Sequence, residues 1–276
     1  MTMNNDAPTS LRVVRDIPYG PAADALRLGD LYLPSDAAPD TPCLLLIHGG
    51  GWRGGDRLKV AGVAEFLCRD LGFAVFNIEY RLASAANRWP NCGDDCLSAA
   101  RFLLSGAMGD MLGASPRKIW ICGVSSGGHL ALWTLLHLPD DAVTAAISIS
   151  SIGDPVPDFG HRYRYEALFG EDVSEGSLRA MDPVPLVRPG LAPLLCTHAV
   201  GDEVVPVASH RAFADAYRAA GNACDFFEYP HDAEPNTGGH FIWRTPNPPR
   251  PLLRILENRI ASFVRDCRNP ADRTSP

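Results

Sequence analysis

The sequence lacks a long hydrophobic run and lacks an excess of positive charge. No apolar stretch among its 276 residues approaches the roughly 20 residues that a membrane-spanning helix requires. Its 25 lysines and arginines are outnumbered by 32 aspartates and glutamates, so the net charge is −7. This balance argues against a nucleic-acid or acidic-membrane partner. Residues 1–16 have neither a basic start nor an apolar core, so we expect no signal peptide and a cytoplasmic protein.

The sequence also lacks a cysteine and histidine spacing that would hold a metal ion. Cys92 and Cys96 are separated by three residues, but no second pair nearby completes a zinc site. Cys43, Cys122 and Cys196 lie within strand-like apolar runs, where a reduced cysteine acts as a small apolar residue. We therefore expect structural thiols, no metal and no cofactor.

No internal repeat, low-complexity block or change of composition marks a domain boundary. Short apolar runs alternate with helical patterns, which is typical of strands joined by crossover helices. The runs predict strands within 11–20, 25–34, 43–49, 73–81, 118–125, 145–151, 194–202 and 224–230. Helical spacing predicts helices within 59–72, 94–108, 127–138, 208–221 and 252–267. We expect one α/β domain over 11–267, with a mostly parallel sheet of about eight strands flanked by helices, and flexible tails at 1–10 and 268–276.

The segment 151–190 does not follow this alternation. It is rich in proline, glycine, charged and aromatic residues. Ligands of open α/β sheets bind beyond the carboxyl ends of the strands, where an insertion can cover them. The segment is therefore predicted to be a short cap or lid within the domain.

Two adjacent serines follow the predicted strand at 118–125. Gly123-Val124-Ser125-Ser126-Gly127 fits the pattern G-x-S-x-G between a buried strand and a helix. Such a sharp turn exposes the serine hydroxyl and requires glycine on both sides of it. Centring the pattern on Ser126 would place Val124 at a glycine position, so Ser125 is the candidate nucleophile. The backbone N–H of Ser126, at the helix start, would face a developing oxyanion.

Three further motifs occur in the order that a serine hydrolase needs. His48-Gly49-Gly50-Gly51-Trp52 follows a buried strand, Gly201-Asp202-Glu203-Val204-Val205-Pro206 follows another, and Gly238-Gly239-His240-Phe241 precedes the last helix. With these motifs the chain resembles the α/β-hydrolases of the esterase and lipase group. It is most similar to the small carboxylesterases and feruloyl- or acetyl-esterase-like proteins of the BD-FAE type, relatives of hormone-sensitive lipase and kynurenine formamidase.

The resemblance implies an α/β-hydrolase fold and assigns the remaining catalytic parts. Asp202 would orient the base, with Glu203 as its rival, and His240 would be the base, with His231 as its rival. Gly50 and Gly51 would bind the oxyanion together with Ser126.

The substrate is predicted to be a small-molecule ester with a short acyl chain or an aryl group. Candidate substrate contacts are Trp52, Trp89, His161, Arg162 and Arg164, and Arg244 could add positive charge near the entrance. An amide substrate, as in aryl-formamidases, remains an alternative, although Gly51 in place of their bulky residue favours esters. A non-catalytic binding protein on the same fold is a further alternative. A monomer and a small homo-oligomer are both compatible with the sequence.

Overall fold

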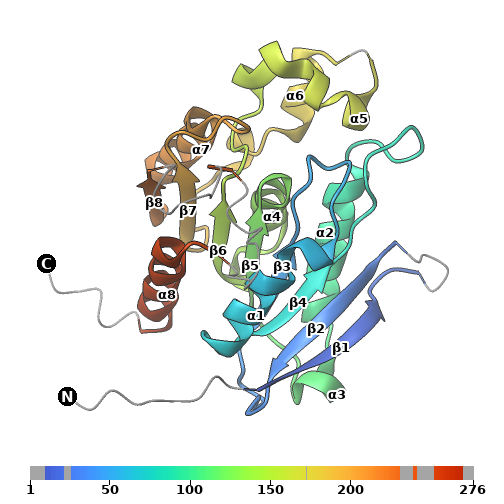
Figure 1. Ribbon diagram of the computed structural model, residues 1–276, viewed down its shortest axis with the longest axis vertical. Coiled ribbons are helices and arrows are strands. Elements are labelled where there is room, and N and C mark those ends of the chain that lie inside the picture. The colour runs from blue at the N-terminus through green and yellow to red at the C-terminus, as the bar shows by residue number, and fades with distance from the viewer. Residues whose placement is uncertain (1–9, 22–25, 172, 231–238, 241–251, 270–276) are drawn as a thin grey trace, which may run out of the picture.

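The computed structural model describes residues 10–21, 26–171, 173–230, 239–240 and 252–269. Eight strands form one sheet in the order β1-β2-β4-β3-β5-β6-β7-β8 (Figure 1). They are β1 (Leu11–Pro18), β2 (Leu28–Pro34), β3 (Cys43–Ile47), β4 (Ala74–Ile78), β5 (Ile119–Val124), β6 (Val143–Ile149), β7 (Leu194–Ala199) and β8 (Cys224–Tyr229). β1 and β2 pair antiparallel with each other, and β2 pairs antiparallel with β4. All other pairs are parallel, so the predicted mostly parallel sheet is confirmed.

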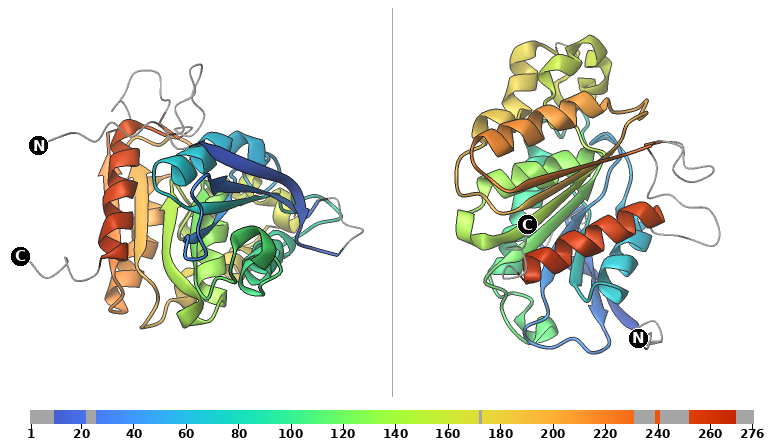
Figure 2. Two further views of the ribbon diagram at one scale, coloured as in Figure 1. Left: turned by 90° about the horizontal axis from the view of Figure 1, so that it is seen from below. Right: turned by 90° about the vertical axis from the view of Figure 1, so that its left-hand side faces the viewer.

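Two layers of helices cover the two faces of the sheet (Figure 2). On one face lie α1 (Ala61–Arg69) and α8 (Arg254–Arg268). The short helix η1 (Arg57–Val60) directly precedes α1. On the other lie α2 (Asn91–Leu104), α3 (Gly109–Leu112), α4 (Ser126–His137) and α7 (Val207–Ala219). β3 shows how both faces are filled, because Leu44 and Leu46 point into one core and Leu45 and Ile47 into the other. None of the described helices is long and apolar enough to cross a membrane.

Residues 151–190 leave the sheet directly after β6 and form short helical turns. These turns are η3 (Val156–Arg164), α5 (Glu166–Phe169), α6 (Glu175–Met181) and η4 (Val184–Leu186). One more short helix, η2 (Asp140–Ala142), precedes β6. The backbone N–H of Trp89 donates to the Leu168 carbonyl oxygen at 3.0 Å, and His129 Nε2 donates to the Met181 carbonyl oxygen at 2.8 Å. The segment therefore packs on the loop after β4 and on α4, at the top of Figure 1. Its role as a cap stays a prediction.

The eight cysteines all lie in the described part of the chain, and none of them forms a disulfide bond. Six of them are buried: Cys43, Cys68, Cys92, Cys96, Cys122 and Cys196. Burial raises the pKa of the Cys43 thiol to about 11 and that of Cys122 to about 12. Because the thiolate is the reactive form, these buried thiols are poor nucleophiles in the folded protein.

Candidate active site

Ser125 occupies the sharp turn between β5 and α4. Its backbone has φ +54° and ψ −125°, a conformation that residues other than glycine rarely adopt. The flanking glycines are required by space. A Cβ at Gly123 would lie 2.0 Å from the Gly127 carbonyl oxygen, and one at Gly127 would lie 2.3 Å from the carbonyl oxygen of His48. The predicted strand–turn–helix context is confirmed, and the turn presents Ser125 at the carboxyl edge of the sheet.

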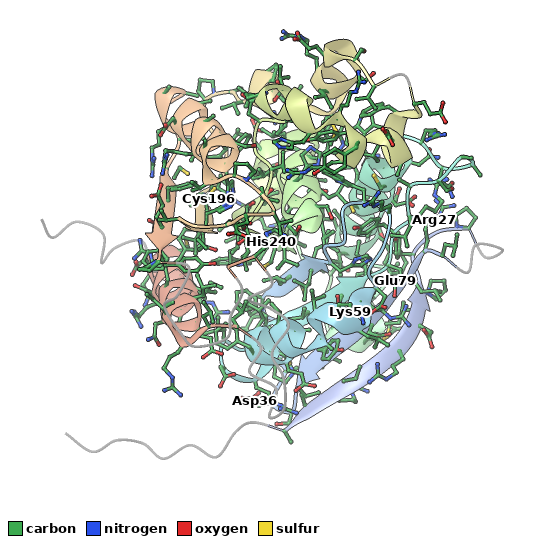
Figure 3. All side chains as sticks on the ribbon, turned by 45° about the horizontal axis from the view of Figure 1, so that its top comes forward. Arg27, Asp36, Lys59, Glu79, Cys196 and His240 are labelled. Carbon is green, nitrogen blue, oxygen red and sulfur yellow. The ribbon has the colours of Figure 1, made fainter. Side chains whose placement is uncertain are left out.

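Ser125, His240 and Asp202 are joined by two hydrogen bonds. Ser125 Oγ lies 2.9 Å from His240 Nε2, and His240 Nδ1 lies 2.7 Å from Asp202 Oδ2. Ser125 follows β5 and Asp202 follows β7, whereas His240 comes after β8. Figure 3 places His240 near the middle of the molecule. All three residues are buried.

The Asp202 carboxylate is surrounded by hydrogen-bond donors. Its Oδ1 accepts from the backbone N–H groups of Val204 at 2.9 Å and Val205 at 2.8 Å. Its Oδ2 faces His240, and His198 Nε2 lies 3.4 Å from the same oxygen. Burial alone would raise the pKa of Asp202, but hydrogen bonds from His198 and His240 outweigh it and hold the pKa well below its ordinary value. The carboxylate therefore stays ionised beside the imidazole.

The glycine loop after β3 has backbone conformations that favour glycine. Gly50 has φ +136° and Gly51 has φ +61°. The Gly50 carbonyl oxygen accepts a hydrogen bond from the Gly54 N–H at 3.1 Å. The His48 ring stacks on Tyr80 with 4.3 Å between ring centroids, and the Tyr80 hydroxyl donates to the His48 carbonyl oxygen at 3.1 Å. His48 Nδ1 also lies 2.8 Å from the Gly49 carbonyl oxygen, so the ring is held between Tyr80 and the backbone of the loop.

A cavity of about 460 Å³ opens in front of Ser125. Its lining combines both glycines of the loop, the two serines and residues of the 151–190 segment. The wall consists of Gly50, Gly51, Trp52, Arg53, Ser125, Ser126, Ile152, Tyr163, Arg164, Glu203, Val204, Val205 and His240. A volume of this size is within the usual range for small-molecule sites.

The predicted substrate contacts separate into two groups. Trp52 and Arg164 line the cavity, whereas Trp89, His161 and Arg162 are not among its described lining residues. The indole N–H of Trp89 donates to the Ala180 carbonyl oxygen at 3.0 Å, so this side chain binds the 151–190 segment instead. His161 and Arg162 are exposed, and the backbone departs from helical geometry at His161. His231 and Arg244 lie outside the described residues.

The chain matches known esterases over most of its length. The BD-FAE family model matches residues 29–143. An AB hydrolase superfamily protein of Schizosaccharomyces pombe is 36% identical over 37% of this chain and 29% of its own. The versiconal hemiacetal acetate esterase stcI of Emericella nidulans is 31% identical over 79% of this chain and 79% of its own. The chain belongs to the α/β-hydrolase carboxylesterases.

A solved structure supports the fold of this α/β-hydrolase. An inhibited esterase B from Lactobacillus rhamnosis superimposes with a TM-score of 0.74 at 20% identity, covering 99% of this chain and 92% of that one. At this identity the likeness bears on the fold alone.

Sequence reasoning missed several residues of the α/β-hydrolase site. Arg53, Ile152, Glu203 and Val204 had no assigned substrate role, yet all line the cavity. Arg53 directly follows the glycine motif, and Glu203 and Val204 directly follow Asp202, so their neighbours in the sequence could have indicated them. Ile152 carries no such signal, because its place depends on how the segment after β6 folds back over the sheet.

Proposed function

We propose that the protein hydrolyses small carboxylic esters through an acyl-enzyme formed on Ser125. The observation that carries the proposal is the hydrogen-bonded chain from Ser125 Oγ through His240 to Asp202, with distances of 2.9 and 2.7 Å. A serine hydroxyl becomes a good nucleophile when a base removes its proton and an acid orients that base. Membership of the carboxylesterases supports an ester as substrate.

The proposed reaction has two steps. Ser125 Oγ attacks the ester carbonyl carbon while its proton moves to His240 Nε2, and His240 then protonates the departing alcohol. In the second step His240 takes a proton from water, the resulting hydroxide attacks the acyl carbon, and the acid leaves as Ser125 regains its proton. Asp202 holds the His240 ring and stabilises its charged form. The N–H groups of Gly50, Gly51 and Ser126 would bind the oxyanion, where one donor contributes about 10²-fold to 10³-fold in rate.

The cavity favours a substrate with a short acyl or an aryl group. Trp52, Ile152 and Val205 supply apolar wall next to Ser125. The volume of about 460 Å³ suits a compact ester better than a long lipid chain. The relative from Emericella nidulans is named for an acetate ester, which agrees with a small acyl group.

Turnover of p-nitrophenyl acetate and butyrate, together with labelling by a fluorophosphonate, tests the proposal. Wild type is expected to turn over both esters and to carry the label on the peptide that contains Ser125. Ser125→Ala is expected to lose about three or more orders of magnitude in kcat and to take no label. Equal rates in the two proteins would overturn the proposal. If the protein prefers N-formyl aromatic amides, its substrate is an amide and not an ester. Absence of both turnover and label would indicate a binding protein.

A further inference from the structure

Two fully buried histidines lie behind the catalytic acid of the proposed site. His198 is the penultimate residue of β7, and its Nε2 lies 3.4 Å from Asp202 Oδ2 and 2.9 Å from the Val205 carbonyl oxygen. Its other ring nitrogen, Nδ1, lies 3.0 Å from Nδ1 of His210 on α7. Both rings have 0% exposure, so no solvent competes for these contacts.

The partners fix which nitrogen carries hydrogen. The Val205 carbonyl oxygen can only accept, so His198 Nε2 carries a proton and can share it with Asp202 Oδ2. In the neutral ring His198 Nδ1 is then an acceptor, and His210 Nδ1 must be the donor between them. Burial lowers the pKa of His210, which keeps that ring neutral. The described residues offer no partner to His210 Nε2, as expected for an unprotonated nitrogen of this tautomer.

The histidine pair also connects the Asp202 loop to α7. His210 follows Ser209, whose hydroxyl oxygen accepts from the Gly153 and Asp154 N–H groups at 3.2 and 3.0 Å. His210 in turn packs edge-on against Phe226 of β8 with 5.4 Å between ring centroids. The loop that carries Asp202 is thus tied through two rings to a helix anchored in the core.

We propose that His198 is a positioning residue for the reaction, which keeps Asp202 Oδ2 directed at His240 Nδ1. It acts in two ways. His198 Nε2 donates toward Asp202 Oδ2 itself, and it also holds the carbonyl group of Val205, a residue whose backbone N–H donates to Asp202 Oδ1. Without the donor at Nε2, the carboxylate can rotate away from His240. This inference rests on the proposed function, because it assigns His198 a task in the same reaction.

Three substitutions at His198 separate positioning from packing. In His198→Gln the amide nitrogen takes the place of Nε2 and can still donate to Val205 and Asp202. His198→Asn is shorter, so its polar group takes the place of Nδ1 and faces His210 only. His198→Phe has neither. We expect kcat for p-nitrophenyl acetate to fall about ten-fold in the Asn and Phe variants with KM unchanged within about two-fold, and to recover in the Gln variant.

A second measurement does not depend on turnover. The proton that His240 Nδ1 shares with Asp202 gives a low-field proton NMR signal in the free enzyme, and His240→Gln identifies it. We expect that signal to persist in His198→Gln and to shift upfield or broaden in His198→Asn, while thermal unfolding confirms that each variant is folded. Unchanged kcat and signal in His198→Asn, or equal losses in the Gln and Asn variants, would overturn the positioning role. The signal can be read even if Ser125→Ala disproves ester hydrolysis, so the two proposals fail separately.

Discussion

Gly127 lies against His48 so closely that a Cβ at Gly127 would be 2.3 Å from the His48 carbonyl oxygen. The contact joins the first turn of α4 to the end of β3, where the glycine loop begins. The serine turn and the glycine loop are therefore fixed relative to each other by backbone packing, before any side chain of the site is considered.

Gly127→Ala is expected to lower both stability and activity. The added methyl group meets backbone oxygens that cannot move aside, and overpacking of this kind costs about 1–3 kcal/mol. Denaturant unfolding and ester turnover measure the two effects. Gly160→Ala is the matched control, since a Cβ at Gly160 meets no atom within 4 Å. Equal unfolding midpoints for the two variants would contradict the prediction.

Alanine at the two loop glycines is expected to have unequal effects. A Cβ at Gly50 would lie 1.9 Å from the Gly54 carbonyl oxygen, whereas one at Gly51 would meet nothing within 4 Å. Both have positive φ, so both substitutions add backbone strain. Gly50→Ala must also reshape the loop, and we expect a loss of about 10²-fold or more in kcat. Steady-state kinetics of both variants test this order, and a larger loss in Gly51→Ala would reverse it.

Ser126→Ala is expected to retain most of the activity. The proposed role of Ser126 uses its backbone N–H, which alanine keeps, and alanine is the better helix former at the start of α4. The measurement is kcat/KM for p-nitrophenyl acetate beside that of Ser125→Ala. If Ser126→Ala loses activity and Ser125→Ala keeps it, the assignment of the nucleophile is reversed.

Stability is expected to fall in mild acid because of His129. Burial lowers its pKa to about 4 from an ordinary 6.5, and a hydrogen bond to the Met181 carbonyl offsets this only in part. Between these values the unfolded chain binds a proton that the folded protein does not. The free energy of unfolding therefore decreases as pH falls from 6.5 to 4, by up to about 1.4 kcal/mol per pH unit.

His129→Gln provides the control for this titration. Glutamine can keep the hydrogen bond to Met181 and does not titrate. The free energy of unfolding of the variant, measured in urea, should therefore change less steeply with pH, because about one proton fewer is taken up on unfolding. His210, whose pKa burial also lowers, contributes equally to both proteins. Identical pH dependence of wild type and variant would show that His129 does not carry the effect.

The sequence was sufficient to predict the elements and much of the site. Short apolar runs located all eight strands, and the five longer helices overlap the ranges that helical spacing indicated, with ends that differ by up to about four residues. His240 lies within hydrogen-bond distance of both Ser125 and Asp202, although it is 115 and 38 positions away from them. Ser125 was marked by the glycines that its turn requires, whereas Asp202 and His240 were chosen from the resemblance to α/β-hydrolases and from their order in the chain. Their catalytic roles stay predictions.

Features that depend on packing between distant segments could not be predicted. His161, Arg162 and Arg164 are nearly adjacent in sequence, but of these three only Arg164 lines the cavity, and the backbone of η3 is non-helical at His161. Trp89 looked like a pocket residue and instead packs against Trp133 with 4.7 Å between ring centroids. His210 lies on a helix face whose burial against β7 follows only from the completed sheet, so nothing nearby in the sequence pairs it with His198.

The buried thiols make the protein a reporter of its own local opening. Cys43, Cys122 and Cys196 lie on β3, β5 and β7, and a thiol reagent can reach each only when its strand is transiently exposed. Labelling rates, followed peptide by peptide, therefore give opening free energies across the sheet without an introduced probe. Cys122 lies three positions before Ser125, so its protection measures how firmly the nucleophile turn is closed.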